Sequence, residues 1–288
     1  MTQHIQQIDP QDFPAILKEI TDPPEKLYLR GTMPAPSYKT LAVVGSRSAT
    51  AYGREVVEYL IHGLRGYPVA IVSGMALGID GAAHTAALDA GLPTVAVLGC
   101  GLSEERLHPR AHVQLAHRIL DAGGALLSEF EPDQQAAPWT FPQRNRIVVG
   151  LSGAVLIIEA AERSGSLITA RLAVEYNREL LVVPGSIFAA SSKGAHQFLK
   201  LGATPATTPE DILEALRIPP HATENTEKDI ALALSPEEQE LYDALAQPCP
   251  RDELIAKLSY SVTTANILLS KLELEGVIVE KFGTLRRV

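Results

Sequence analysis

With 288 residues, the chain has room for one large domain and a small second one. Its two cysteines exclude a disulfide framework, and its net charge of −9 means that any anion site must be a local concentration of arginine. No apolar run approaches the roughly 18–20 residues of a membrane helix, and no secretory signal is predicted at the N-terminus. A reduced cytoplasm is the expected location.

Residues 1–30 are predicted to be a short polar segment ahead of the main domain. Over residues 31–216, short unbroken apolar runs alternate with helix-length segments, which is typical of parallel strands buried on both faces. The sequence therefore predicts an α/β domain with a doubly wound, mostly parallel, Rossmann-like sheet. The predicted strands are Leu41–Val44, Val69–Val72, Thr94–Leu98, Ala125–Leu127, Ala154–Ile158 and Leu180–Val183.

The C-terminal part is predicted to be a linker, residues 217–234, followed by a small winged helix-turn-helix domain, residues 235–288. Residues 233–288 have a net charge of −3, and the third helix offers DNA only Lys271, against Glu273. We therefore expect this domain to bind protein or to pack on the main domain, and not to bind duplex DNA tightly. The predicted helices are Ser235–Ala246, Arg251–Leu258 and Val262–Leu274, the last ended by Gly276, and the predicted strands are Val277–Lys281 and Thr284–Val288.

The stretch Trp139–Arg171 contains two turns that are rich in small residues and arginine. A helix is predicted to open after Pro142, which places Arg144 and Arg146 where free backbone N–H groups already attract an anion. The second turn, Arg163–Ser166, follows an apolar strand and opens the next helix. Two such turns in succession predict phosphate binding.

Loops that follow parallel strands lie along one edge of the sheet, where folds of this class bind ligands. We therefore expect Arg47, after the first of these strands, to converge with Arg144 and Arg146 on one groove. The alternative for Arg146 is that it points away from Arg144 and pairs with an acid. Trp139 and Phe141 lie within a few residues of Arg144 and Arg146 in the sequence. Aromatic rings beside arginines suit single-stranded nucleic acid, because bases stack on the rings while phosphates pair with the arginines. The alternative for Trp139 is that it anchors the core.

The sequence offers little support for an enzyme. The turn GSRSATAYG lacks the GxGxxG fingerprint, and Ser73 stands where a dinucleotide-binding domain has an acid, so no cofactor is expected. Asp80 and His84 are interpreted as a helix N-terminal acid and a satisfied polar residue, and no catalytic triad or metal-ligand spacing occurs. Glu159 follows an apolar strand, and it keeps a nucleotide-processing hydrolase open as the alternative function.

Five segments together resemble the DprA/Smf family of bacterial DNA-processing proteins. The resemblance runs from about Asp22 to the C-terminus, in the order and spacing of that family. It implies a cytoplasmic, non-enzymatic protein that forms a homodimer through its Rossmann-like domain and binds single-stranded DNA in preference to duplex. It also implies that the protein protects incoming strands and loads a RecA-type recombinase in natural transformation. The segments are Gly45-Ser46-Arg47, SGMALGIDGAAH (73–84), FPQRNRIVVGLS (141–152), ERSGSLITARLA (162–173) and VPGS (183–186).

The same resemblance implies which residues contact DNA. Arg110 is a weaker candidate, because Leu107-His108-Pro109 stands where the family has a Tyr-Pro turn. The chain departs from the family at His196, where Asn is usual, and the helical domain that many members carry before the sheet is expected to be missing or truncated. The implied contacts are Ser46, Arg47, Phe141, Arg144, Asn145, Arg146, Ser164, Gly165 and Ser166.

Overall fold

The computed structural model describes residues 4–162, 164–219, 234–245, 247–258, 260–274, 277–281 and 283–287. The chain divides into two units, one ending at Pro219 and the other beginning at Pro220. Most of the predicted linker (220–233), together with Arg163 and Gly276, lies outside the described residues.

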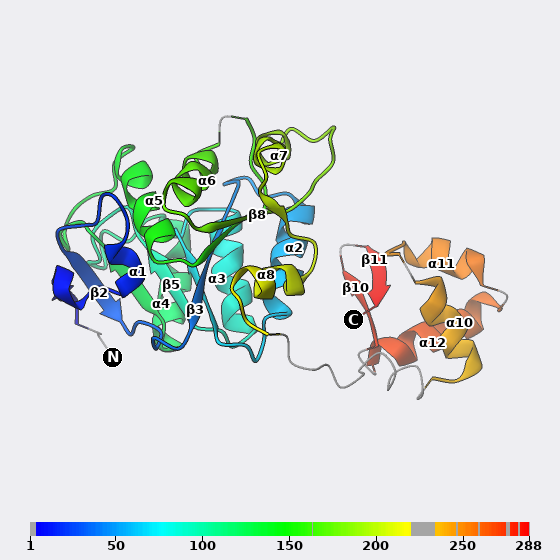
Figure 1. Ribbon diagram of the computed structural model, residues 1–288. Coiled ribbons are helices and arrows are strands. Elements are labelled where there is room, and N and C mark those ends of the chain that lie inside the picture. The colour runs from blue at the N-terminus through cyan, green and yellow to red at the C-terminus, as the bar shows by residue number, and fades with distance from the viewer. Residues whose placement is uncertain are drawn as a thin grey trace. The chain divides into compact units, whose positions relative to one another are not determined.

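A nine-stranded sheet forms the centre of the first unit, with helices on both of its faces (Figure 1). Its strands are β1 (Gln6–Ile8), β2 (Leu27–Gly31), β3 (Lys39–Val44), β4 (Val69–Ser73), β5 (Thr94–Val97), β6 (Ala125–Ser128), β7 (Ala154–Ile157), β8 (Glu179–Val182) and β9 (Thr204–Pro205). Their order is β1-β2-β6-β5-β4-β3-β7-β8-β9, and all neighbouring pairs from β6 to β9 are parallel. The predicted doubly wound, mostly parallel sheet is confirmed.

Two sets of helices cover the two faces because successive strand residues point to opposite sides. Val72 packs with the first set, and its neighbour Ile71 packs with the second. The first set is α1 (Ala15–Lys18), α5 (Thr140–Gly150), α6 (Ser166–Glu175) and α7 (Lys193–Lys200). The second set is α2 (Ala51–His62), α3 (Ile79–Asp89), α4 (Val113–Asp121) and α8 (Pro209–Ala215).

The strand order reverses at β3, which pairs with β4 on one side and with β7 on the other. Leu41 of β3 lies opposite both Ile71 of β4 and Ala154 of β7. Since these strands are parallel, the loops that follow them leave the sheet at the same edge. This switch point is where ligands bind in open α/β sheets, and it brings together loops that are far apart in the sequence.

The N-terminal residues are part of the sheet and do not simply precede it. Strands β1 and β2 extend the sheet with antiparallel pairing, Tyr28 lying opposite Gln7 on one side and Ser128 on the other. Phe13 and Leu17 are buried in the core. The polar composition of this segment reflects its place at the edge, where a strand is paired on one side only.

The second unit is a winged helix, as predicted from the sequence. Its elements are α10 (Pro236–Ala244), α11 (Arg251–Lys257), α12 (Val262–Leu274) and a hairpin of β10 (Ile278–Lys281) and β11 (Thr284–Arg287). Ser235 begins α10, where its hydroxyl accepts from the Glu238 backbone N–H at 3.3 Å and its own N–H donates to the Glu238 carboxylate at 2.7 Å. Reciprocal bonds of this kind satisfy two free donors at the start of a helix.

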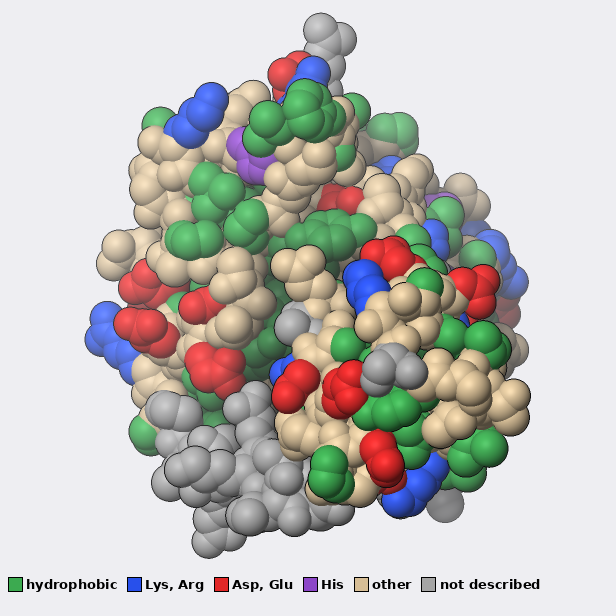
Figure 2. Space-filling view, turned by 90° about the vertical axis from the view of Figure 1, so that its right-hand side faces the viewer, with side chains coloured by type: hydrophobic (Ala, Val, Ile, Leu, Met, Phe, Trp, Pro, Cys, Tyr) green, Lys and Arg blue, Asp and Glu red, His purple; other side chains and the backbone are tan. Residues whose placement is uncertain are grey.

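On the face shown in Figure 2, acidic and basic side chains are interspersed with neutral and hydrophobic ones. This mixed surface agrees with a net charge that is negative and modest for the length of the chain. In the part of the chain that the structure describes, no helix combines the length and the apolar character needed to cross a membrane.

Candidate nucleic-acid interface

A pocket of about 560 Å³ lies at the edge of the sheet where the loops after β3, β4 and β7 meet the start of α5. Its wall combines backbone of small residues with two arginines and one aromatic ring. Eight of the ten sequence-predicted contact residues line it: Ser46, Arg47, Phe141, Arg144, Asn145, Ser164, Gly165 and Ser166. The topology therefore gathers residues that the sequence separates by about a hundred positions.

Arg47 and Phe141 form the exposed part of this pocket. The guanidinium carbon of Arg47 lies 5.3 Å from the centroid of the Phe141 ring, and Arg47 is exposed to solvent. The ring of His108 lies 5.7 Å from that of Phe141, tilted by 47°. Phe141 also packs on Gly99, where an added Cβ would lie only 2.9 Å from the ring. The Phe141 ring is therefore held in place beside a free positive charge.

Arg144 contributes mostly as a brace behind the pocket. It is 3% exposed, and its Nη1 donates to the carbonyl oxygens of Gly74 and Val97, while its Nε donates to Asn145 Oδ1 at 3.2 Å. Burial lowers the pKa of Arg144, and the nearby Asp80 carboxylate opposes that shift. The side chain ties α5 to the ends of β4 and β5 and adds positive charge to the wall.

Arg146 and Arg110 lie outside the pocket. Residues two apart on a helix point in nearly opposite directions, so Arg146 faces away from Arg144. It forms ion pairs with the partly buried Glu129 and, from Nε, with Asp22 at 3.2 Å. Arg110 donates a hydrogen bond to the Glu104 carbonyl oxygen at 3.1 Å. The expected convergence therefore includes Arg47 and Arg144 and not Arg146.

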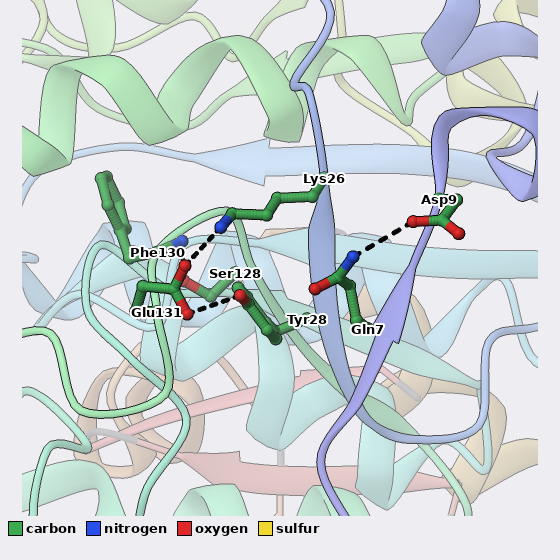
Figure 3. Close-up of polar contacts among 7 residues, drawn as sticks. All are labelled: Gln7, Asp9, Lys26, Tyr28, Ser128, Phe130 and Glu131. Carbon is green, nitrogen blue, oxygen red and sulfur yellow. Dashed lines mark hydrogen bonds and ion pairs between the residues drawn. The ribbon is translucent and has the colours of Figure 1, made fainter.

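Trp139 is neither a core anchor nor part of the pocket. It is 57% exposed and packs edge-on against Phe130, with the ring centroids 5.7 Å apart. Beside Phe130, the Glu131 carboxylate accepts hydrogen bonds from Lys26 and, at 2.6 Å, from the Tyr28 hydroxyl (Figure 3). These contacts fasten the loop after β6 to the antiparallel part of the sheet.

Asp80 and His84 lie on α3 and have different environments. Asp80 lines the pocket and accepts from the Ala76 backbone N–H at 3.3 Å; burial raises its pKa, and the Arg144 charge opposes the rise. His84 is fully buried with its Nδ1 2.7 Å from Thr94 Oγ1, and burial lowers its pKa to about 3. The interpretation of His84 as a satisfied polar residue holds at Nδ1, and Asp80 stands in the first turn of α3, as interpreted. Asp80 also lines the pocket, which sequence reasoning missed.

Two segments of small residues shape the floor and the rim of the pocket: one where Gly78 meets Ser46, and the other the turn Ser164–Ser166. Gly78 has a φ of 81°, and a Cβ added there would lie 2.2 Å from the Ser46 carbonyl oxygen, so only glycine allows this approach. At the other turn, the hydroxyls of Ser164 and Ser166 lie 2.6 Å apart, and Gly165 faces open space. Helix α6 begins at Ser166, close to the predicted start at Leu167.

Glu159 lies outside this pocket and anchors α2. It is 3% exposed and accepts two hydrogen bonds from Thr50, one from the backbone N–H at 3.0 Å and one from the hydroxyl at 2.6 Å. Thr50 is the residue that caps α2, so the carboxylate fixes the start of that helix.

The winged-helix unit uses its basic side chains internally. Arg251 pairs with Glu273 at 2.7 Å and with Glu280 at 2.8 Å, and Lys271 pairs with Glu238. Charges committed in this way are less available to phosphates. The expectation that this unit is not a strong reader of duplex DNA stays a prediction.

The family described as DNA recombination-mediator protein A matches residues 4–217, and the DprA winged helix domain matches residues 225–283. Protein Smf of Escherichia coli is 41% identical over 272 residues, which are 93% of this chain and 69% of that protein. DNA processing protein DprA of Streptococcus pneumoniae is 42% identical over 201 residues, or 70% of each protein.

Two solved structures share this architecture. DNA processing protein A from Streptococcus pneumoniae superimposes with a TM-score of 0.69 and 39% identity, covering 74% of this chain and 75% of that one. DNA processing protein A from Helicobacter pylori, whose structure is described in terms of its unique single-stranded DNA binding mode, gives a TM-score of 0.64 and 30% identity. That match covers 75% of this chain and 98% of the Helicobacter chain.

Proposed function

The chain belongs to the DNA recombination-mediator protein A family, and on that premise we propose that it binds single-stranded DNA in the pocket of Arg47 and Phe141. The observation that carries the proposal is an exposed guanidinium 5.3 Å from a fixed aromatic ring, bordered by two turns of small residues. A guanidinium pairs with phosphate oxygens, a ring stacks with a base, and small residues let the strand approach the backbone.

The proposal assigns each residue a part. Arg47 pairs with a phosphate, Phe141 stacks with a base, and Asn145 and the hydroxyl-bearing turns supply polar contacts. Arg144 contributes charge from behind the wall, and Arg146 positions the start of α5. Arg110 contacts a longer strand, because it lies two residues beyond His108, whose ring packs against that of Phe141.

We further propose the cellular role that the family resemblance implies. The protein is a cytoplasmic homodimer joined through its Rossmann-like domain, and it protects incoming single strands and loads a RecA-type recombinase in natural transformation. Binding and positioning suffice for this role, so the proposal includes no catalytic step.

Fluorescence anisotropy with a labelled strand of about 20 nucleotides tests the proposal, since a site of this kind spans fewer. The parent should bind the single strand more tightly than a matched duplex, with affinity falling steeply between about 50 and 200 mM salt. Arg47→Glu should weaken binding by about tenfold or more, and Phe141→Ala by about tenfold. Arg65→Glu, a charge reversal at the far end of α2, is the control.

Two results would contradict the proposal. One is a folded Arg47→Glu variant that binds single strands like the parent, and the other is equal affinity for duplex and single strand. A nucleotide-hydrolysis assay on the same samples separates strand binding from the alternative of a hydrolase.

A further inference from the structure

A second hollow, of about 490 Å³, lies beside the Arg47 pocket at the same edge of the sheet. It opens between the start of α2 and the turn 184–192 that follows β8. Ser48 lines the first pocket and Thr50 lines the second, so the two hollows are separated only by the turn that leads into α2. A strand that fills the first pocket reaches the second by rounding this turn.

A buried carboxylate forms the floor of this second hollow. Glu159 is 3% exposed, and both of its hydrogen bonds come from Thr50. Among the residues that the structure describes, no lysine or arginine forms an ion pair with Glu159. Glu159 lines the hollow, and each carboxylate oxygen offers two acceptor positions of which Thr50 uses one, so the group keeps acceptor capacity. A buried acceptor of this kind favours a ligand that carries N–H donors.

An aromatic ring forms one wall. The Tyr52 hydroxyl donates to the Pro184 carbonyl oxygen at 2.8 Å, which fixes a ring that remains 48% exposed. Burial raises the pKa of Tyr52, and the negative charge of Glu159 adds to the rise. Tyr52 and Glu159 both line the hollow. The turn 184–192 also carries Phe188, whose side chain is 90% exposed. The hollow therefore combines a flat apolar wall with an acceptor floor.

We propose that this second hollow binds one amino-bearing nucleobase, with the base against Tyr52 and its exocyclic amino group donating to Glu159. The inference rests on the proposed single-strand binding, because the base is supplied by the strand that occupies the Arg47 pocket. Cytosine, adenine and guanine carry such an amino group. Thymine has none, and its single N–H donor, N3–H, lies between two carbonyl oxygens that the carboxylate repels. A lysine side chain of a protein partner would satisfy the carboxylate but would leave the ring wall unused.

Binding of oligo-dC and oligo-dT strands of about 20 nucleotides tests the inference by anisotropy. The parent should prefer oligo-dC by about ten- to a hundredfold, the effect of one hydrogen bond to a charged group. Glu159→Gln should remove that preference, because the amide presents an N–H₂ where an acceptor is needed. Glu162→Gln is the matched control: it makes the same chemical change three residues on, at an exposed position, and should keep the preference.

Tyr52→Leu provides a second variant in case Glu159→Gln melts early, because Glu159 also holds Thr50. Loss of the ring should weaken the binding of both strands and reduce the preference for oligo-dC, since the base is no longer oriented. Calorimetric titration with the monomers dCMP and dTMP shows whether a free nucleotide enters the same hollow.

Equal affinity of the parent for oligo-dC and oligo-dT overturns the inference and leaves the proposed function standing. A preference that survives in folded Glu159→Gln, or that is undiminished in Tyr52→Leu, also overturns it. If the parent binds neither strand, the proposed function fails, and the titrations with dCMP and dTMP then decide whether the hollow binds a nucleobase. Saturable dCMP binding that Glu159→Gln abolishes then supports a nucleobase site, and no dCMP binding overturns it.

Discussion

Replacing Arg144 by methionine should destabilise the fold, whereas the same change at Arg47 should not. Methionine keeps much of the volume of the Arg144 side chain but none of its donors, so the buried carbonyl oxygens of Gly74 and Val97 lose their partner. Each orphaned buried group costs about 1–3 kcal/mol, which puts the loss in free energy of unfolding at about 2–6 kcal/mol. Arg47 is exposed, and its replacement should stay within about 0.5 kcal/mol of the parent.

Thermal melting followed by circular dichroism measures both effects. For a domain of this size, 1 kcal/mol corresponds to about 2–4 °C, so Arg144→Met should lower the melting temperature by about 4–24 °C. Single-strand binding is then measured well below the transition of each variant. There, Arg47→Met should bind weakly although it melts like the parent.

The opposite pattern would refute the reasoning. If Arg144→Met melts like the parent, the two carbonyl oxygens are satisfied in another way and Arg144 is not a brace. If Arg47→Met is as unstable as Arg144→Met, the guanidinium of Arg47 is not free to receive a phosphate.

Three further outcomes are expected. Gly78→Ala should lower the free energy of unfolding by about 2–4 kcal/mol and weaken strand binding, because a Cβ there would lie 2.2 Å from a carbonyl oxygen. Gly91→Ala, at a similar φ but in open space, is the control and should cost only about 1 kcal/mol, both measured by urea unfolding. The Lys271 ammonium holds the pKa of Glu238 at about 2. The contribution of Glu238 to stability is therefore present above its ordinary pKa of 4.5 and lost as the pH falls toward 2, so the melting difference between the parent and Glu238→Gln should close over that range. Burial lowers the pKa of His84 from 6.5 to about 3, so the unfolded chain takes up the proton at a higher pH than the folded chain does. The free energy of unfolding should therefore fall as the pH drops below 6.5, and it should fall less steeply in His84→Gln.

The central strands could be predicted closely because burial on both faces leaves an unbroken apolar run. The strand expected at Ala154–Ile158 spans Ala154–Ile157. Strand β1 escaped prediction because it lies at the edge of the sheet, where pairing with one neighbour does not require an apolar run. Strand β2 pairs on both sides, but its apolar run, Leu27–Leu29, is cut short by Arg30. Helix α5 begins at Thr140, two residues before Pro142, since the Thr140 hydroxyl bonds the Gly99 and Ala137 carbonyl oxygens at 2.5 and 2.8 Å.

The meeting of Arg47 with Phe141 follows from topology alone, because loops at a switch point converge wherever they stand in the sequence. The burial of Arg144 does not follow from topology. Its partners, the carbonyl oxygens of Gly74 and Val97, lie at the ends of β4 and β5, and nothing in the sequence there signals that they accept a guanidinium. Sequence reasoning placed Arg144 at a helix start, but it could not show that Arg144 is buried and used internally whereas Arg47 is exposed.

The pairing of β3 with β7 also determines when, during synthesis, the chain should become able to bind a single strand. Val44 pairs with Ile157, so the turn that carries Arg47 has no neighbour on that side until the ribosome has delivered β7. Contacts of such large sequence separation form late in folding, since a long loop must close before they stabilise anything. A nascent or prematurely terminated chain that stops short of α6 lacks the Ser164–Ser166 turn. Only molecules whose main domain is complete should therefore compete for single strands in the cell.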